Sequence, residues 1–305
     1  MNNVVSLQNL SKCFGSIRAV DDLSLTVEQG TILGIAGPDG AGKTTLLRLM
    51  TGVLGKYSGS INILGSENDI EPVKSRIGYM PQRFSLYADL TVQENIELLG
   101  ALYGLNKDEL EEKAEKMLRF VGLWKFKKRF AGKLSGGMKQ KLALVAATLH
   151  TPEILFLDEP TTGVDPVARR EFWQMLYGLN RQGMTIIVAT PYMDEAELCH
   201  QILLMHHGKG APCQTPQQII AAYPYTVLQL DSSERRLPEM LHGCYMKGLD
   251  CFRDTYHIVT DDAERTVREV TNRLAELGQR VPTLLNISPS LEDAFILFAE
   301  RGEQS

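Results

Sequence analysis

Residues 37–44 form a glycine-rich loop that constrains the fold of this chain more than any other segment. They read GPDGAGKT, which fits the spacing G-x-x-x-x-G-K-[ST]; an apolar run at residues 32–36 precedes them, and leucines and a methionine follow at residues 46–50. A strand, a glycine turn and a helix in this order aim successive backbone N–H groups and the positive end of the helix at a phosphate. The pattern predicts an α/β fold with a phosphate site at this loop.

The loop also predicts which groups hold the ligand. Lys43 would add a full positive charge beside the β- and γ-phosphates of a nucleotide, and the Thr44 hydroxyl would ligate Mg²⁺. The candidate nucleotide-binding residues in and next to the loop are Gly37, Pro38, Asp39, Gly40, Ala41, Gly42, Lys43, Thr44 and Thr45. The expected ligand is a nucleoside triphosphate with Mg²⁺.

A second apolar run, at residues 154–157, ends in two carboxylates, Asp158 and Glu159. Taken alone, an apolar run that ends in Asp-Glu is common, and the phosphate loop gives it meaning. A buried strand beside that loop would place Asp158 near the metal bound to Thr44. Glu159 would then polarise a water that attacks the γ-phosphate, the role of a general base. We therefore expect Asp158 to be a metal ligand and Glu159 to be catalytic.

Apolar runs at residues 32–36, 154–157 and 185–189 set the expected architecture. They are short, continuous and separated by helical segments, which favours a mixed, mainly parallel sheet with covered faces. We expect an α/β domain at 1–220 that contains a helical subdomain at about 84–150, with helices at 94–104 and 107–121. A small α+β domain is expected at 221–305, with strands at 225–230 and 256–259 and an amphipathic helix at 265–277. Val267, Val270, Leu274 and Leu277 form one apolar face of that last helix.

Charge and composition exclude several classes of protein. The 305 residues include 32 basic and 37 acidic side chains, a net charge of -5, so a basic field over the whole protein for gripping nucleic acid is absent. The most apolar stretch, residues 142–157, is interrupted by polar residues and a proline, so no transmembrane helix is expected. The first residues lack the pattern of a signal peptide, and the five cysteines lack metal-like spacing. We expect a soluble cytoplasmic protein with reduced thiols.

Between the two motifs, residues 134–140 read LSGGMKQ, and with this segment the chain resembles the ATP-binding cassette (ABC) ATPases over residues 4 to about 220. The family signature is LSGGQ, and Met138 stands here in place of its glutamine. The matching residues are Leu134, Ser135, Gly136, Gly137 and Met138. They open a helix, which makes them a second anion-binding terminus. The resemblance implies ATP and Mg²⁺ as ligands and a head-to-tail dimer in which this segment completes the ATP site of a partner cassette.

Three further matches follow the order of the family, although each is weak by itself. Phe14 stands where the family has an aromatic residue that stacks on adenine. Gln82, in YMPQ at residues 79–82, matches the glutamine that senses Mg²⁺ and the attacking water, which implies a catalytic and a metal-binding role. Asp165 matches the aspartate that touches the opposite subunit of the dimer.

Among ABC ATPases, the segments GPDGAGKTT and LSGGMKQK are similar to those of the ATPase subunits of YbhF-like drug exporters, and so is SLEDAF at residues 290–295. The resemblance implies an energy-coupling ATPase that works with a separate membrane permease, peripheral on the inner face of the cell membrane. Two other functions remain open, a soluble cassette acting on nucleic acid or the ribosome and a nucleotide-binding regulatory module with little hydrolysis.

The chain departs from the family at Pro191, where a histidine normally hydrogen-bonds the γ-phosphate. Proline has no side-chain donor, and such a donor is worth about 3–4 kcal/mol, or two to three decades in rate. Either this cassette pairs with a different, histidine-containing cassette and hydrolyses ATP slowly itself, or it homodimerises with Glu159 and Gln82 sufficient for slow turnover. We favour the heterodimer. His200, His206 and His207 are expected to be ordinary surface or strand residues.

Overall fold

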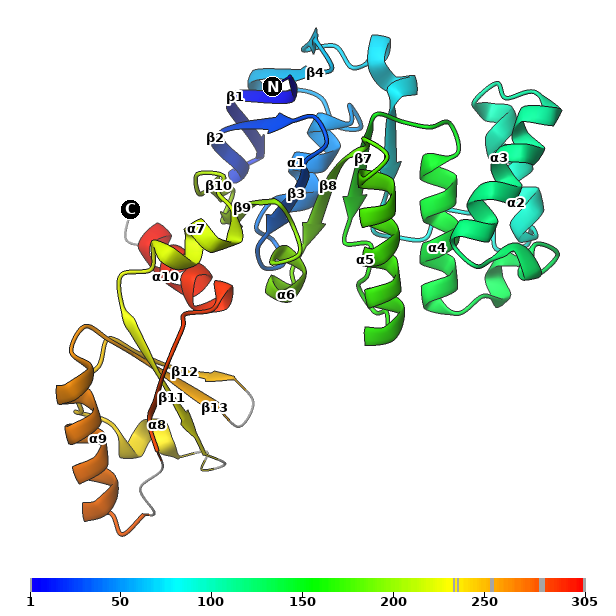
Figure 1. The fold of residues 1–305 in the computed structure, drawn as a ribbon. Coiled ribbons are helices and arrows are strands. Elements are labelled where there is room, and N and C mark those ends of the chain that lie inside the picture. The colour runs from blue at the N-terminus through cyan, green and yellow to red at the C-terminus, as the bar shows by residue number, and fades with distance from the viewer. Residues whose placement is uncertain (1, 233, 235, 253–254, 280–282, 304–305) are drawn as a thin grey trace. The chain divides into compact units, whose positions relative to one another are not determined.

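The computed structural model describes residues 2–232, 234, 236–252, 255–279 and 283–303 (Figure 1). The chain divides into two compact units. The first comprises Met1–Pro216 together with Phe298–Ser305, and the second comprises Gln217–Leu297. Each unit has its own sheets and its own hydrophobic cluster, so each can be described by itself.

A six-stranded sheet in the order β10-β9-β3-β8-β7-β6 forms the centre of the first unit, and all neighbouring strands in it are parallel except β9 and β10. Its strands are β3 (Ile32–Ala36), β6 (Ile77–Met80), β7 (Ile154–Asp158), β8 (Thr185–Thr190), β9 (Gln201–His206) and β10 (Lys209–Gly210). Every residue of β3, β7 and β8 is buried, which explains why these strands read as continuous apolar runs. The expected mixed, mainly parallel sheet is confirmed.

A second sheet of the first unit is antiparallel, in the order β2-β1-β4-β5. Its strands are β1 (Asn3–Phe14), β2 (Ile17–Glu28), β4 (Ser58–Ile63) and β5 (Ser66–Glu67). In β2, Leu23, Leu25 and Val27 are buried and the residues between them are exposed, so one face packs on the core and the other meets solvent. Strands in which buried and exposed residues alternate do not form continuous apolar runs, so this sheet was not predicted from the sequence.

The helices of the first unit pack against the six-stranded sheet and against one another (Figure 1). They are α1 (Lys43–Met50), α2 (Val92–Leu102), α3 (Lys107–Phe120), α4 (Gly136–Thr148), α5 (Pro166–Asn180) and α6 (Met193–Ala196), and α7 (Pro216–Ala221) begins at the boundary of the unit. Capping boxes begin α2, with Thr91 and Glu94, and α3, with Asn106 and Glu109. The cap at Thr91 explains why α2 begins two residues before the predicted helix. No helix among the described residues is long and apolar enough to cross a membrane.

His150 joins the end of α4 to the core sheet. Its Nε2 lies 2.8 Å from the carbonyl oxygen of Ile77 in β6, and its ring stacks on Tyr103 with 4.1 Å between centroids. Its Nδ1 is buried and has no hydrogen-bond partner among the described residues. Burial lowers the pKa of this imidazole below its usual 6.5, and the charge of Lys113 lowers it further, whereas the bond to Ile77 opposes the shift. The neutral ring therefore donates from Nε2.

This histidine predicts a pH-dependent stability of the first unit. Because its pKa is lower in the folded state, the unfolded state binds the proton first as pH falls through about 6.5. The free energy of unfolding should therefore decrease from pH 7.5 to 5.5, and decrease less in His150→Gln, whose amide still donates to Ile77. Urea unfolding followed by fluorescence of Trp124 and Trp173, both in the first unit, measures this. The exposed His242→Gln change should leave the slope unaltered; equal slopes in all three proteins would contradict the prediction.

The second unit is an antiparallel sheet in the order β12-β13-β11-β14 with helices. Its elements are β11 (Thr226–Asp231), α8 (Leu237–Met240), β12 (Gly248–Phe252), β13 (Thr255–Thr260), α9 (Ala263–Glu276), β14 (Leu285–Ile287) and the first part of α10 (Leu291–Glu303). Val270 and Leu274 of α9 are buried in its core. The prediction for Leu277 is wrong: it is 42% exposed because α9 ends at Glu276 and Leu277 is its C-cap.

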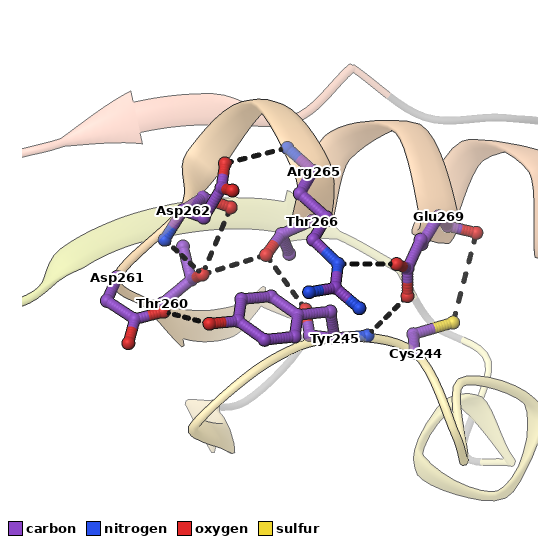
Figure 2. Close-up of polar contacts among 8 residues, drawn as sticks. All are labelled: Cys244, Tyr245, Thr260, Asp261, Asp262, Arg265, Thr266 and Glu269. Carbon is purple, nitrogen blue, oxygen red and sulfur yellow. Dashed lines mark hydrogen bonds and ion pairs between the residues drawn. The ribbon is translucent and has the colours of Figure 1, made fainter.

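Polar contacts fasten the start of α9 to this sheet (Figure 2). The Asp262 side chain accepts from the N–H of Arg265, which caps the helix. Thr266 donates to the carbonyl oxygen of Tyr245, and its hydroxyl also lies 2.8 Å from that of Thr260. Every group here has a partner within the unit, so this cluster is structural.

Candidate functional site

A cavity of about 380 Å³ lies where the carboxyl ends of four strands meet, because the residues that follow β3, β6, β7 and β9 all reach it. It is lined by Ile17, Arg18, Ala19, Asp39, Gly40, Ala41, Gly42, Lys43, Thr44, Thr45, Gln82, Glu159 and His207. The carboxyl edge of a parallel sheet is the usual place for a ligand in such folds. The fold thus brings the loop residues 39–45 together with Gln82 and Glu159, which are far apart in the sequence.

Two glycines of the phosphate loop are required by close packing. A Cβ atom on Gly37 would lie 2.1 Å from the carbonyl oxygen of Met205, and one on Gly42 would lie 2.1 Å from that of Ala19. Gly42 also has φ 106°, which favours glycine. It precedes α1, and no side chain caps this helix. The N–H groups of the first turn of α1 therefore remain for an anionic ligand.

Lys43 is buried at the base of the loop and curls back over it. Its ammonium donates to the carbonyl oxygens of Gly37 at 2.8 Å and Pro38 at 2.9 Å, and lies 3.6 Å from Oε1 of Glu159. Gly37 and Pro38 do not line the cavity, and they act here by holding this lysine. The positive charge therefore lies between the loop and the acid at the end of β7.

Thr44 and Asp158 form the contact that a shared metal would require. The Thr44 hydroxyl donates to Oδ1 of Asp158 at 2.8 Å. Asp158 is fully buried, and burial raises its pKa above the usual range while the bond from Thr44 opposes the shift. A hydroxyl and a carboxylate oxygen at this distance are hard ligands of the kind that Mg²⁺ takes in nucleotide sites. The two residues fit the expected metal, which would also favour the ionised carboxylate.

Glu159 has a backbone conformation that side chains rarely adopt, with φ +49°. Its N–H donates to the carbonyl oxygen of Ala189 in β8 at 2.9 Å. Its Oε2 accepts from Nε2 of Gln82 at 2.8 Å and from the hydroxyl of Thr162 at 3.3 Å. Residues held in this region cost about 1–3 kcal/mol each and concentrate at functional sites. The carboxylate is thus aimed into the cavity with a strained backbone and a fixed orientation.

Phe14 does not line this cavity. Its ring is 47% exposed at the end of β1, and the ammonium of Lys12 lies 5.0 Å from the ring centroid. A ring this exposed can stack on a flat ligand. Its position therefore neither supports nor contradicts the role in adenine stacking that the resemblance implies for Phe14.

The residues of the signature segment and Asp165 also lie outside the cavity lining. Leu134 is buried, and Ser135 is the N-cap of α4, where its hydroxyl accepts from the N–H of Met138 at 3.4 Å. Asp165 is the N-cap of α5 and accepts from two backbone N–H groups of its first turn. A Cβ atom on Gly137 would lie 2.8 Å from Cβ of Ala168, so the starts of α4 and α5 are packed together.

Pro191 follows the last residue of β8 and supplies no side-chain donor. His200 accepts from the N–H of Ile32 at 3.1 Å, as expected for a residue that supports a strand. His207, however, lines the cavity, as do residues 17–19, and the sequence analysis missed all four. Gly208 donates to the carbonyl oxygen of Ala41 at 3.0 Å, which fastens this turn to the loop. No local pattern signals that contact, because it depends on β9 pairing with β3.

Comparison with known proteins gives the family. The sequence profile described as ABC transporter matches residues 20–162. The probable multidrug ABC transporter ATP-binding protein YbhF of Escherichia coli is 44% identical over 214 residues, which cover 68% of this chain and 36% of that protein. The Nod factor export ATP-binding protein I of Sinorhizobium fredii is 34% identical over 306 residues, which cover 97% of this chain and 86% of that protein. The chain thus spans about a third of the length of the first relative and most of the second.

A solved structure agrees with these relatives. The dimeric structure of an ATP-binding cassette in a post-hydrolysis state, bound to ADP and Pi, has a TM-score of 0.63 and 28% identity, covering 69% of this chain and 98% of that one. A whole cassette is therefore contained in the present fold. With a glycine loop, the Thr44 hydroxyl and the acid Glu159 lining one cavity, and with relatives of this similarity, the chain belongs to the ABC transporter family.

Proposed function

We propose that this chain is the ATP-binding and ATP-hydrolysing subunit of an ABC exporter, working with a separate membrane permease. One observation carries the proposal: Lys43, Thr44, Gln82 and Glu159 line a single cavity, and the Thr44 hydroxyl is bonded to the buried Asp158 behind it. The names of the relatives add the export role, because both are ATP-binding proteins of transporters described as multidrug or Nod factor export.

The nucleotide would be held mainly by its phosphates. The uncapped N–H groups at the start of α1 bind phosphate oxygens, and Lys43 leaves its carbonyl partners to contact the β- and γ-phosphates. Thr44, Asp158 and Gln82 are the residues that would hold Mg²⁺, which when bound neutralises charge that develops on the phosphate oxygens. Phe14 would stack on the adenine.

Glu159 and Gln82 would carry the hydrolytic step. A water oriented by their side chains attacks the γ-phosphorus, the bond from that phosphorus to the β-phosphate bridging oxygen breaks, and ADP leaves with its electron pair. The Glu159 carboxylate accepts the proton of the water, so that ADP and phosphate are the products. The ion pair with Lys43 and the bond from Gln82 keep the carboxylate oriented before the nucleotide enters.

The segment from Leu134 to Met138 would complete the site of a second cassette. Ser135, Gly136 and Gly137 lie at the start of α4, outside the lining of this chain's own cavity, where their N–H groups would meet the nucleotide of another subunit. Asp165 would contact the second cassette beside this segment. The solved relative is itself a dimer, which supports this arrangement.

Pro191 predicts a slow site in this chain and a histidine-containing partner cassette. Restoring the donor in Pro191→His should raise kcat of the purified chain at least about tenfold, because recovering even half of the about 3–4 kcal/mol that such a donor is worth gives more than one decade in rate. The rate of phosphate release at saturating ATP measures this. The Pro212→His change, in a loop away from the cavity, should leave kcat unaltered. An unchanged rate in Pro191→His would mean that the missing donor does not limit turnover.

The role in export is tested by coexpressing the tagged chain with the genes adjacent to its own. We expect the chain to sediment with membranes and to copurify with a permease and a second cassette that carries the histidine. A stable homodimer with normal, Glu159-dependent hydrolysis would overturn the heterodimer. Cosedimentation with ribosomes, lost on treatment with ribonuclease, would overturn the export role itself.

A further inference from the structure

Glu195 is a buried acid that the mechanism above does not use. It lies in α6, just after the loop that contains Pro191, and is only 1% exposed. Its Oε1 accepts from the hydroxyl of Thr161, and its Oε2 accepts from the hydroxyl of Thr190 at 2.8 Å. Nε of Arg169, in α5, lies 3.3 Å from Oε1. None of these four residues lines the nucleotide cavity.

The two threonines bonded to Glu195 belong to the segments that hold Glu159. Thr161 lies two residues beyond Glu159, in the turn where the N–H of Thr162 donates to the carbonyl oxygen of Glu159 at 3.3 Å. Thr190 ends β8, next to Ala189, which accepts from the N–H of Glu159 at 2.9 Å. The turn after β7 is thus attached to the end of β8 twice, once by backbone and once through the Glu195 carboxylate.

Arg169 makes this bridge possible electrostatically, because a buried carboxylate without a charged partner is costly. Its guanidinium also lies 4.4 Å from the ring centroid of Tyr192 and 3.5 Å from Oδ2 of Asp194. The arginine is therefore held on three sides by the segment around α6. Since it stands on α5, the bridge connects the start of this helix to both of the segments that hold Glu159.

A strained backbone needs such support. Glu159 keeps φ +49° only while its surroundings oppose relaxation to an ordinary conformation. Relaxation would turn its carboxylate away from Gln82 and from the cavity. Pro191, which follows β8, has no side-chain donor that could hold Glu159 from this side. The attachment between these segments then depends on the backbone bond to Ala189 and on the bridge through Glu195.

We infer that Glu195, through Thr161, is a positioning residue that holds Glu159 in its catalytic conformation. This inference rests on the proposed function, because it requires Glu159 to act in hydrolysis. Thr190 also accepts from the N–H of Gly37 at 3.4 Å, whereas Thr161 and Glu195 do not line the cavity. The bond between Thr161 and Glu195 therefore governs the rate of the chemical step and not the affinity for ATP.

The test removes one hydroxyl from the bridge in the full chain. Thr161→Val keeps the shape and leaves Glu195 with Thr190 and Arg169, whereas Thr161→Ser keeps the hydroxyl. We expect kcat to fall about tenfold in Thr161→Val and to stay within about twofold in Thr161→Ser, because small misplacements of a catalytic group cost one to two decades. The Kd of a fluorescent ATP analogue with Mg²⁺ should remain within about twofold in both.

Thr185→Val is the matched control. Thr185 is, like Thr161, a buried threonine, but it lies at the start of β8, at the opposite end of that strand from Thr190, and its hydroxyl accepts from the N–H of Gly30 at 2.9 Å. It should lower stability as Thr161→Val does and leave kcat unchanged. If Thr161→Val keeps the full kcat, or if kcat falls equally in Thr185→Val, the positioning role is wrong.

A double-mutant cycle with Glu159→Gln separates the two proposals. If Thr161 acts through Glu159, Thr161→Val should slow the unaltered chain but not the Glu159→Gln chain. An equal slowing in both backgrounds would make the bridge merely structural and overturn the inference. If Glu159→Gln hydrolyses ATP as fast as the unaltered chain while Thr161→Val is slower, the proposed role of Glu159 fails, and the inference about Glu195 falls with it.

Discussion

Glu159→Gln is expected to hydrolyse ATP at about one hundredth of the unaltered rate or less, since loss of a general base costs two to four decades. Glutamine keeps the size of the side chain and an oxygen that accepts from Gln82, so the geometry at the end of β7 should persist. The affinity for ATP should stay the same or increase, because the buried negative charge facing the γ-phosphate is removed. Single-turnover hydrolysis of γ-labelled ATP and equilibrium binding of a fluorescent analogue measure the two effects.

Glu153→Gln provides the control for this variant. Glu153 immediately precedes β7, whereas Glu159 immediately follows it. The carboxylate of Glu153 pairs with Arg76 at the surface. It should alter neither hydrolysis nor binding by more than about twofold, because an exposed ion pair contributes little. If Glu159→Gln hydrolyses ATP at more than half the normal rate, Glu159 is not the general base.

The Lys43→Met variant should lose ATP affinity rather than rate alone. The change removes the ammonium and keeps an apolar stem of similar length, so the segment of residues 37–45 loses its one positively charged side chain. Charged hydrogen bonds of this kind are worth about 2–4 kcal/mol, which corresponds to an increase in Kd of about 30- to 1000-fold. Isothermal titration with ATP and Mg²⁺ measures this directly.

Lys141→Met is the matched change outside the site. Lys141 is a mostly buried lysine of α4 whose ammonium lies 2.7 Å from the carboxylate of Glu171, and it does not line the cavity. Its loss should lower stability slightly and leave the Kd for ATP within about twofold. If Lys43→Met binds ATP as tightly as the unaltered chain, the loop at residues 37–44 is not the phosphate site, and the proposed function has no basis.

Much of the core and the site was accessible from sequence, and the reasons are local. The strands β3, β7 and β8 are buried on both faces, so they stand out as unbroken apolar runs, and the parallel sheet follows from them. The antiparallel sheet of β1, β2, β4 and β5 has one face in solvent and alternating polarity, and it escaped the same search. Likewise Leu277 continues the apolar period of α9 but lies beyond its last helical residue.

The amino-acid sequence by itself determined the chemistry at the end of each strand: the glycine loop after β3, Gln82 after β6, and Asp158 and Glu159 at the end of β7. Only the tertiary structure decided which ends meet. Strand order is a non-local property, and the polarity of one strand carries no record of its neighbours, so neither His207 at the cavity nor the bridge from Glu195 to Thr161 and Thr190 could be deduced. Those contacts exist because β8 lies between β3 and β7, and β9 lies on the other side of β3.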